Sequence, residues 1–357
     1  MPVFEVLTPR ERYPAIVERG ILARAADYLP PKAGRVFVVS TQDVWKHQGE
    51  ALERALAGTR HEVLFLPGGE DHKRLAPLEA LAGQMVERGG DRSSLVIAFG
   101  GGIVNDMAGF LAAIFMRGIP VVQIPTTLLA QVDAAIGGKT GVNLAAGKNL
   151  IGSFHQPLAV LIDPALLDTL PEREYRAGLF EVLKHGVIRS QELFRVMAER
   201  SPEVLARVPD VVDFMIADSV RIKAEVVSAD EREGGLRRIL NFGHTIGHAL
   251  EAETAYSRFL HGEAVAFGMQ AAVRLAESAR HLSPDDSACI RAAIRRYGPL
   301  PPLDGIPAES LLRRLGSDKK TVQGKVHFVL PTRIGQVTVV SGIEDALVLN
   351  AIRAALA

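Results

Sequence analysis

The stretch SLVIAFGGGIVNDMAG (94–109) predicts a strand, a turn of three glycines and the start of a helix. Gly100, Gly101 and Gly102 let backbone amides approach an anion, and the N-terminus of the helix adds partial positive charge. This geometry suits a phosphate group. The spacing is not G-x-G-x-x-G, so the turn lacks the standard dinucleotide fingerprint, and a tight turn that binds nothing would use the same residues.

Two further loops follow apolar strand candidates. PGGEDHK (67–73) is a second glycine turn that carries Glu70 and Lys73, and PTT (125–127) places two hydroxyls directly after another strand. Ligands of open parallel sheets bind beyond the carboxyl ends of the strands. We therefore expect the three loops to face one crevice.

The first half of the chain alternates short apolar runs with amphipathic stretches such as 43–57 and 74–88. This alternation predicts βαβ units and a parallel sheet. The expected strands are RVFVVS (35–40), HEVLFLP (61–67), SLVIAFG (94–100), PVVQIP (120–125) and LAVLID (158–163).

The strand signal almost disappears between Asp163-Pro164 and about residue 300. We place a boundary near 160–170, with an α/β domain before it and a mainly helical domain after it. Helices are expected at 172–188, 203–227, 236–253 and 262–281, and a small hairpin at 325–331 and 336–340.

Composition excludes several classes of protein. The formal net charge is zero, so no global field favours nucleic acid or an anionic membrane as a partner. Cys289 is the one cysteine, which excludes an intrachain disulfide and a thiolate metal cage. The sequence has no apolar run of membrane-spanning length and no signal-peptide pattern. We expect a cytoplasmic protein.

The stretch QVDAAIGGKTGVNLAAGKNLIGSFHQP (131–157) is rich in glycine yet carries Asp133, Lys139, Lys148 and Asn149. A solvated loop is the simple explanation. The apolar flanks and the strand that follows instead favour lysines held near a ligand. Further polar candidates, each of which alone is typical of a solvated surface, are Lys184, Lys223, Arg237, Asn241 and the pair Lys319-Lys320.

Histidines in the second half indicate a metal site. His244 and His248 in NFGHTIGHALE (241–251) are four residues apart and share one face of a helix. His261 opens LHGEAVAFGM (260–269), which also reads as a helix start, and Glu181 lies in GLFEVLKHG (178–186). Spacing alone leaves open which two of the three histidines bind metal.

Seven motifs, in this order, resemble the 3-dehydroquinate synthase family from about residue 35 to residue 340. The resemblance implies a Rossmann-like NAD-binding α/β domain over 1–165 and a mainly α-helical domain that binds metal and substrate over 166–357. The motifs are GGGIVNDMAGF, RGIPVVQIPTTLLAQVDAAIGGKTGVN, GKNLIGSFHQP, EVLKHG, DEREGGLRRILNFGHTIGHALE, HGEAVAFGM and DKKTVQGKVHFVLP.

The resemblance also implies an activity. The family converts 3-deoxy-D-arabino-heptulosonate 7-phosphate into 3-dehydroquinate and phosphate in the shikimate pathway, which leads to the aromatic amino acids. This carbon–oxygen lyase reaction uses NAD⁺ catalytically, together with a divalent metal such as zinc or cobalt. A homodimer is implied as well.

Residue roles follow only from this resemblance. The implied metal ligands are Glu181, His244 and His261, whereas His248 falls on the substrate side. The implied substrate and phosphate contacts are Arg117, Asp133, Lys139, Asn149, Lys184, Lys223, Arg237, Asn241, His248 and Lys319, which we favour over Lys320. The implied cofactor contacts are Glu70, Lys73, Gly101, Gly102, Asp106, Thr126, Thr127, Lys139, Lys148 and Thr169.

Three residues depart from the usual family pattern. Asn105 stands where glycine is common, Leu144 where histidine is frequent, and His155 where tyrosine is common. None is among the implied site residues, so these departures concern local geometry.

Three alternative functions remain open on the sequence. Another sugar phosphate cyclase, of the 2-deoxy-scyllo-inosose or 2-epi-5-epi-valiolone synthase type, would share the NAD and metal residues. A metal-dependent polyol dehydrogenase would consume NAD⁺ stoichiometrically and would not need so many cations. A nucleotide-binding regulatory protein would not need Glu181, His244 and His261 together.

Overall fold

The computed structural model describes residues 2–317 and 326–357. The chain divides into two units, which we call the sheet unit and the helical unit. The sheet unit contains Met1–Pro171 and Lys223–Glu231, and the helical unit contains Glu172–Ile222 and Arg232–Ala357. The predicted boundary after residue 165 falls inside the short helix η5 (Pro164–Thr169), which belongs to the sheet unit.

A seven-stranded sheet forms the core of the sheet unit, in the order β1-β2-β9-β6-β5-β3-β4. All neighbouring strands are parallel except β1 and β2. The five predicted strands are confirmed, whereas β1 and β2 were not predicted. The strands are β1 (Val3–Leu7), β2 (Arg12–Val17), β3 (Val36–Ser40), β4 (His61–Phe65), β5 (Leu95–Gly100), β6 (Val121–Pro125) and β9 (Ala159–Ile162).

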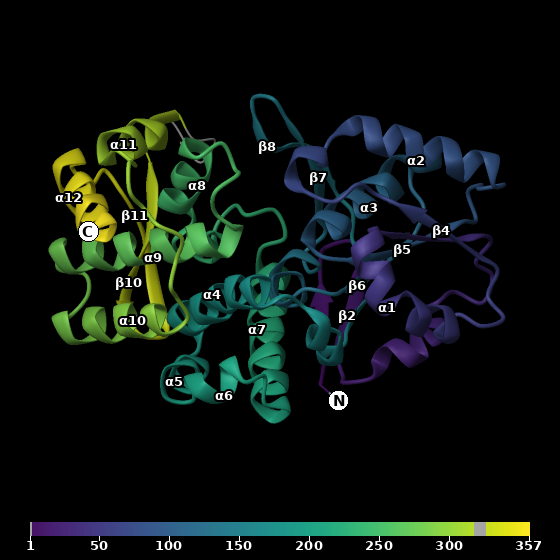
Figure 1. The fold of residues 1–357 in the computed structure, drawn as a ribbon, viewed down its shortest axis with the longest axis horizontal. Helices are drawn as coiled ribbons and strands as arrows, with labels where there is room; N and C mark the ends of the chain where they lie inside the picture. Colours follow the sequence, from purple (N-terminus) through teal and green to yellow (C-terminus); the bar gives the residue numbers. More distant parts are fainter. Residues whose placement is uncertain (1, 318–325) are drawn as a thin grey trace. The chain divides into compact units, whose positions relative to one another are not determined.

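Helices cover both faces of this sheet (Figure 1). Phe37 and Val39 pack with residues of α2 (Leu75–Glu87) and α3 (Gly102–Ile114), while Val36 and Val38 pack with residues of η1 (Ile21–Tyr28) and α1 (Gln42–Ala55). Successive side chains of a strand point to opposite faces. Because both faces are buried, the strands appear in the sequence as continuous apolar runs.

The strand order reverses direction next to β3. The chain passes from β3 outward to β4, returns to β5 on the other side of β3, and continues away from it to β6 and β9. Such a reversal opens a crevice at the carboxyl ends of the two central strands. The turn at Gly100–Gly102 follows β5 and therefore lies at this position.

The glycine-rich stretch 131–157 is structured. It contains the short helix η4 (Ala130–Ala134) and an antiparallel hairpin of β7 (Lys139–Leu144) and β8 (Gly147–Phe154). Thr140 and Asn143 are buried there. The stretch is therefore not an irregular loop, although Lys139 and Asn149 in it are exposed. Glycines on both strands hide the alternation that would have indicated a hairpin.

The helical unit is built around α9 (His261–Ser278), which packs against α4, α8, α10, α12 and β10. The helical unit contains α4 (Glu172–Arg189), α5 (Gln191–Glu199), α6 (Ser201–Leu205), most of α7 (Pro209–Ala229), η6 (Leu236–Asn241), α8 (His244–Glu253), α10 (Pro284–Arg296), α11 (Ala308–Ser317), α12 (Asp345–Leu356) and the hairpin β10 (His327–Arg333) and β11 (Gln336–Ser341).

The helices predicted at 172–188 and 262–281 and the small hairpin are confirmed. Two predicted helices are interrupted: Pro209 starts a new helix inside 203–227, and Phe242 is extended inside 236–253, so that α8 begins at His244. The helices α5, α10, α11 and α12 were not predicted. Among the described residues, no helix combines the length and the apolar character needed to span a membrane.

Candidate functional site

Four candidate metal ligands come together in the helical unit. Glu181 lies in the middle of α4, while His244 and His261 are the first residues of α8 and α9. The Oε1 atom of Glu181 is 3.6 Å from Nε2 of His244 and 3.8 Å from Nε2 of His261. His248 lies one turn after His244, and the three imidazoles each offer a nitrogen within 4.8 Å of the others.

Close packing of backbones brings the three helices to this point. A Cβ atom on Gly262 would lie 1.9 Å from the carbonyl oxygen of Ala177 on α4, and one on Gly268 would lie 1.8 Å from the carbonyl oxygen of Gly243. Both approaches are possible only without a side chain. They set the spacing of α9 from α4 and from the start of α8.

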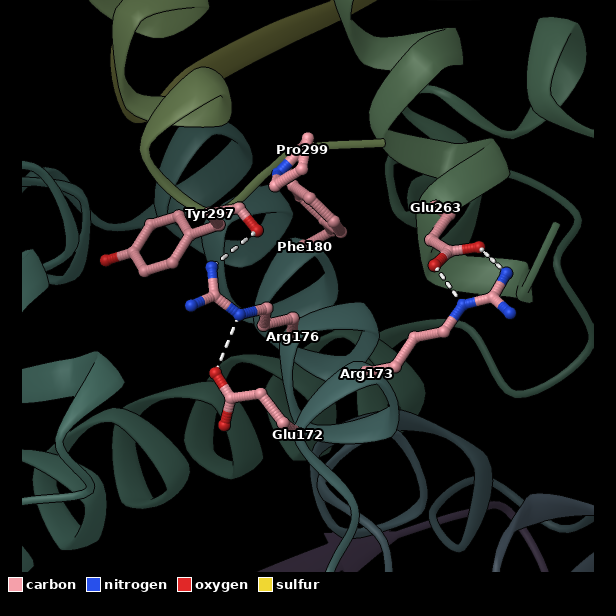
Figure 2. Close-up of a pocket in the computed structure, with 7 residues that line it drawn as sticks. All are labelled: Glu172, Arg173, Arg176, Phe180, Glu263, Tyr297 and Pro299. Carbon is pink, nitrogen blue, oxygen red and sulfur yellow. Dashed lines mark hydrogen bonds and ion pairs between the residues drawn. The ribbon is translucent and has the colours of Figure 1, made fainter. Parts of the chain in front are cut away.

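An ion pair holds the start of α9 on α4 (Figure 2). Arg173 donates to both oxygens of Glu263, at 2.7 and 2.8 Å, and Glu263 also accepts from the backbone amide of Leu260 at 2.8 Å. Glu263 is buried, and the forked geometry of a guanidinium–carboxylate pair fixes orientation as well as distance. The residue that opens α9, His261, is thereby fixed relative to α4.

Neighbouring acceptors orient two of the imidazoles. Nδ1 of His244 lies 3.1 Å from the carbonyl oxygen of Phe242, and Nδ1 of His261 lies 3.4 Å from Oε2 of Glu251. A carbonyl oxygen only accepts hydrogen bonds, so Nδ1 of His244 carries the proton. Its Nε2 lone pair is then available on the side of Glu181.

The Glu181 carboxylate fits a metal ligand. Its side chain is 0% exposed, and within the described residues neither oxygen accepts a hydrogen bond, although Lys184 forms an ion pair with it. A buried charge of this kind needs positive partners. Two imidazole nitrogens and one carboxylate oxygen are a donor set that zinc and cobalt accept. The geometry brings His248 close as well, so it does not by itself choose the ligand set.

Other predicted residues of the helical unit lie on α4 and η6. Lys184 and Arg237 are almost fully buried, which is unusual for solvated cations. Asn241 donates a hydrogen bond to Glu233, which has a φ of 63°. Lys319 and Lys320 lie outside the described residues.

A polar network joins the segment after β4, the helix α3 and the β7–β8 hairpin of the sheet unit. Nζ of Lys73 lies 2.5 Å from Oδ2 of Asp106 and 2.6 Å from Oδ1 of Asn149. Asn143 donates to Oε1 of Glu70 at 2.8 Å and accepts from the amide of Asn149 at 2.9 Å. Asn143 was not predicted, although it stands directly before Leu144 in a motif that was.

Burial raises the pKa of Asp106 above its ordinary value, although the ammonium of Lys73 opposes that shift. The carboxylate is thus incompletely compensated by Lys73 and would gain from a further hydrogen-bond donor. Lys148 contributes charge nearby, with its Nζ atom 3.7 Å from Oε1 of Glu70.

The glycine turn lies beside the hydroxyls that follow β6. The helix α3 begins at Gly102 with Gly101 as its cap, and a Cβ atom on Gly101 would touch the side chain of Thr127 at 3.0 Å. The Thr126 hydroxyl is buried and, in the described part of the chain, has no hydrogen-bond partner. Thr169 accepts from Gln48 at 2.8 Å. The N-terminus of α3 and the orphaned hydroxyl fit a bound phosphate-containing cofactor.

The remaining predicted residues of the sheet unit divide into two groups. Asp133 on η4 forms an ion pair with Lys223 at 2.5 Å, and Lys139 is the first residue of β7. Arg117, in contrast, follows the carboxyl end of α3, and a helix of 13 residues is about 20 Å long. Arg117 therefore lies away from the glycine turn at the start of α3, and its contact with the substrate stays a prediction.

Comparisons with known proteins agree with this geometry. The N-terminal model of 3-dehydroquinate synthase matches residues 63–177, and the C-terminal model matches residues 178–321. A 3-dehydroquinate synthase of Solibacter usitatus (strain Ellin6076) is 70% identical over 357 residues, which is 100% of both chains. The chain belongs to the 3-dehydroquinate synthase family. A member from Koribacter versatilis (strain Ellin345) is 49% identical, over 97% of this chain and 96% of the relative.

A solved structure supports the predicted fold class. ValA, a 2-epi-5-epi-valiolone synthase from Streptomyces hygroscopicus subsp. jinggangensis 5008, was solved with NAD⁺ and Zn²⁺ bound. It is 29% identical, with a TM-score of 0.89 and 96% of each chain covered. The predicted arrangement, a Rossmann-like α/β part followed by a mainly helical part, is thereby confirmed.

The three departures from the family pattern have different local settings. Asn105 is buried and donates to Oε1 of Gln123 at 2.7 Å, so it pairs with the strand β6. A ring nitrogen of His155 lies 2.9 Å from the carbonyl oxygen of Ile119. Leu144 is exposed at the end of β7, and nothing in the structure explains it.

Proposed function

We propose that this chain converts 3-deoxy-D-arabino-heptulosonate 7-phosphate into 3-dehydroquinate and phosphate, as a carbon–oxygen lyase. The observation that carries the proposal is the 70% identity with a 3-dehydroquinate synthase over the full length of both chains. The cluster of Glu181, His244 and His261, in which the carboxylate is fully buried, supports it, because this activity needs a metal and a plain nucleotide-binding protein does not.

We assign the metal ion to one unit and the NAD cofactor to the other. In the helical unit, Glu181, His244 and His261 would hold a divalent ion, which lowers the pKa of a hydroxyl of the substrate. In the sheet unit, the N-terminus of α3 at Gly101–Gly102 would hold the pyrophosphate of NAD. Zinc is bound in ValA at 29% identity, which favours zinc or a similar ion.

The side chains of the sheet unit would fix the cofactor and part of the substrate. Asp106 would accept from a ribose hydroxyl, which supplies the donor that its raised pKa indicates is missing. The Thr126 hydroxyl would gain a hydrogen-bond partner on the bound cofactor. Lys73 holds the side chains of Asp106 and Asn149 in place. Lys139, Lys148 and the pair Asp133–Lys223 complete the polar set.

The side chains of the helical unit would bind the phosphorylated substrate. Lys184 and Arg237 are buried cations, and charge-assisted hydrogen bonds from such groups to phosphate oxygens are strong. Asn241 and His248 would contact hydroxyls. These residues orient the substrate and stabilise charge, and neither role requires a covalent intermediate.

The testing experiment measures phosphate release from the heptulosonate phosphate with metal and substoichiometric NAD⁺. We expect many turnovers per NAD⁺ and no accumulation of NADH, because the hydride returns to the substrate. NADH that accumulates in step with product would instead indicate a polyol dehydrogenase. No release from this substrate, with release from another sugar phosphate, would indicate a cyclase of the ValA type.

The predicted homodimer is tested by the mass of the protein in solution.

A further inference from the structure

We propose that Glu251 is a positioning residue that holds His261 in the orientation needed to bind the metal, without touching the ion itself. The inference rests on the proposed metal site of Glu181, His244 and His261. Glu251 lies on α8, seven residues after His244, and only 2% of it is exposed. Its Oε2 atom is 3.4 Å from Nδ1 of His261, on the neighbouring helix α9.

The two imidazole nitrogens of His261 face different carboxylates. Nδ1 lies beside Glu251, while Nε2 lies 3.8 Å from Oε1 of Glu181. An ionised carboxylate only accepts hydrogen bonds. Glu251 therefore keeps the proton of His261 on Nδ1 and leaves the Nε2 lone pair available on the Glu181 side, where the metal would bind.

His244 also carries its proton on Nδ1, but the acceptor there is a backbone carbonyl. The backbone carbonyl of Phe242 holds its Nδ1 proton, and its Nε2 faces the same oxygen of Glu181 at 3.6 Å. Both imidazoles thus present the same nitrogen to one point. At His261, the first residue of α9, the acceptor that faces Nδ1 is instead a side chain from α8, that of Glu251.

The backbone around Glu251 is itself fixed. Its carbonyl oxygen accepts from the amide of Tyr256 at 2.8 Å and from the Thr254 hydroxyl at 3.3 Å, which closes the end of α8. A buried carboxylate on a fixed backbone is suited to orient a ligand. Outer partners of this kind typically change metal affinity about 10–100-fold when removed.

The test measures the affinity of the metal-free full-length chain for Zn²⁺, by competition with a chromogenic chelator. Glu251→Met keeps the length of the side chain and removes the acceptor, and we expect it to weaken binding about 10–100-fold. Glu251→Gln retains an amide oxygen that accepts from Nδ1 and should recover most of that loss. The matched control is Glu253→Ala, on the same helix, which removes an ion pair with Arg314 and should leave the affinity unchanged.

A second measurement needs no variant at Glu251. Nitrogen NMR of the metal-free chain, with its histidines isotope-labelled, reports which ring nitrogen of His261 is protonated. The signals of His261 are identified as those that disappear in the His261→Ala variant. We expect protonation at Nδ1, and protonation at Nε2 would overturn the proposal even if Glu251→Met failed to fold. Unchanged affinity in a folded Glu251→Met, with Glu181→Ala unable to bind Zn²⁺, would also overturn it and leave the metal site standing. Unchanged affinity in both variants would refute the proposed metal site.

Discussion

The sheet unit and the helical unit place their polar side chains in different ways. In the sheet unit, Gly101 and Thr126 follow two adjacent parallel strands, so the strand order itself makes them neighbours. In the helical unit, Glu181 and His261 come from helices whose spacing depends on backbone contact at Gly262. The first site is set by topology and the second by close packing. We therefore expect the helical site to be the more sensitive to small changes in volume.

The largest effect should come from Glu181→Ala. The change removes one proposed ligand, the carboxylate that Nε2 of His244 and Nε2 of His261 both face, so bound zinc should be lost on dialysis and turnover should fall more than about 100-fold. NAD⁺ affinity, which depends on the sheet unit, should stay within about twofold, a change well under 1 kcal/mol. Parallel loss of NAD⁺ binding would show that the two sites are not independent.

Lys139→Ala tests the sheet unit in the same way. The lysine opens β7, and we expect turnover to fall at least about 100-fold, or ~2.7 kcal/mol in the barrier, with zinc content unchanged. Steady-state kinetics and elemental analysis check the two parts. Activity within about twofold of the unaltered chain would place Lys139 among ordinary surface charges.

Gly268→Ala addresses packing in the helical unit directly. The new methyl group would meet the carbonyl oxygen of Gly243, and overpacking of this kind costs about 1–3 kcal/mol in the free energy of unfolding. Unfolding in urea measures this free energy. Gly83→Ala is the matched control, because a Cβ atom at this position of α2 meets nothing within 4 Å and alanine is the better helix former. Equal stability of the two variants would contradict the packing argument.

The smallest effect should come from Thr126→Val in the sheet unit. Its hydroxyl is buried without a partner among the described residues, so an apolar replacement of the same shape should leave stability unchanged or slightly higher. NAD⁺ should bind more weakly by about 1 kcal/mol, near fivefold, if the hydroxyl bonds the cofactor. Calorimetric titration with NAD⁺ measures this, and unchanged affinity would remove Thr126 from the cofactor site.

The site of the sheet unit, at the ends of β5 and β6, could be predicted from the sequence more fully than the site of the helical unit, for a physical reason. Apolar runs and glycine turns are local signals, so β5, Gly101 and Thr126 could be placed from the order of the residues alone. The roles of Glu251 and Glu263 could not, because they depend on which helices touch. One signal was available: Glu251 lies seven residues after His244, two turns along the same face of the helix.

Metal content of two dialysed variants tests the ligand assignment most directly. His244 and His248 share a helical face, so spacing permits either to pair with Glu181, and the structure brings His261 to the same point. We expect His261→Ala to lose its zinc, and His248→Ala to keep zinc while losing turnover. A zinc-free His248→Ala protein together with a zinc-replete His261→Ala protein would contradict the assignment of Glu181, His244 and His261 as the metal ligands.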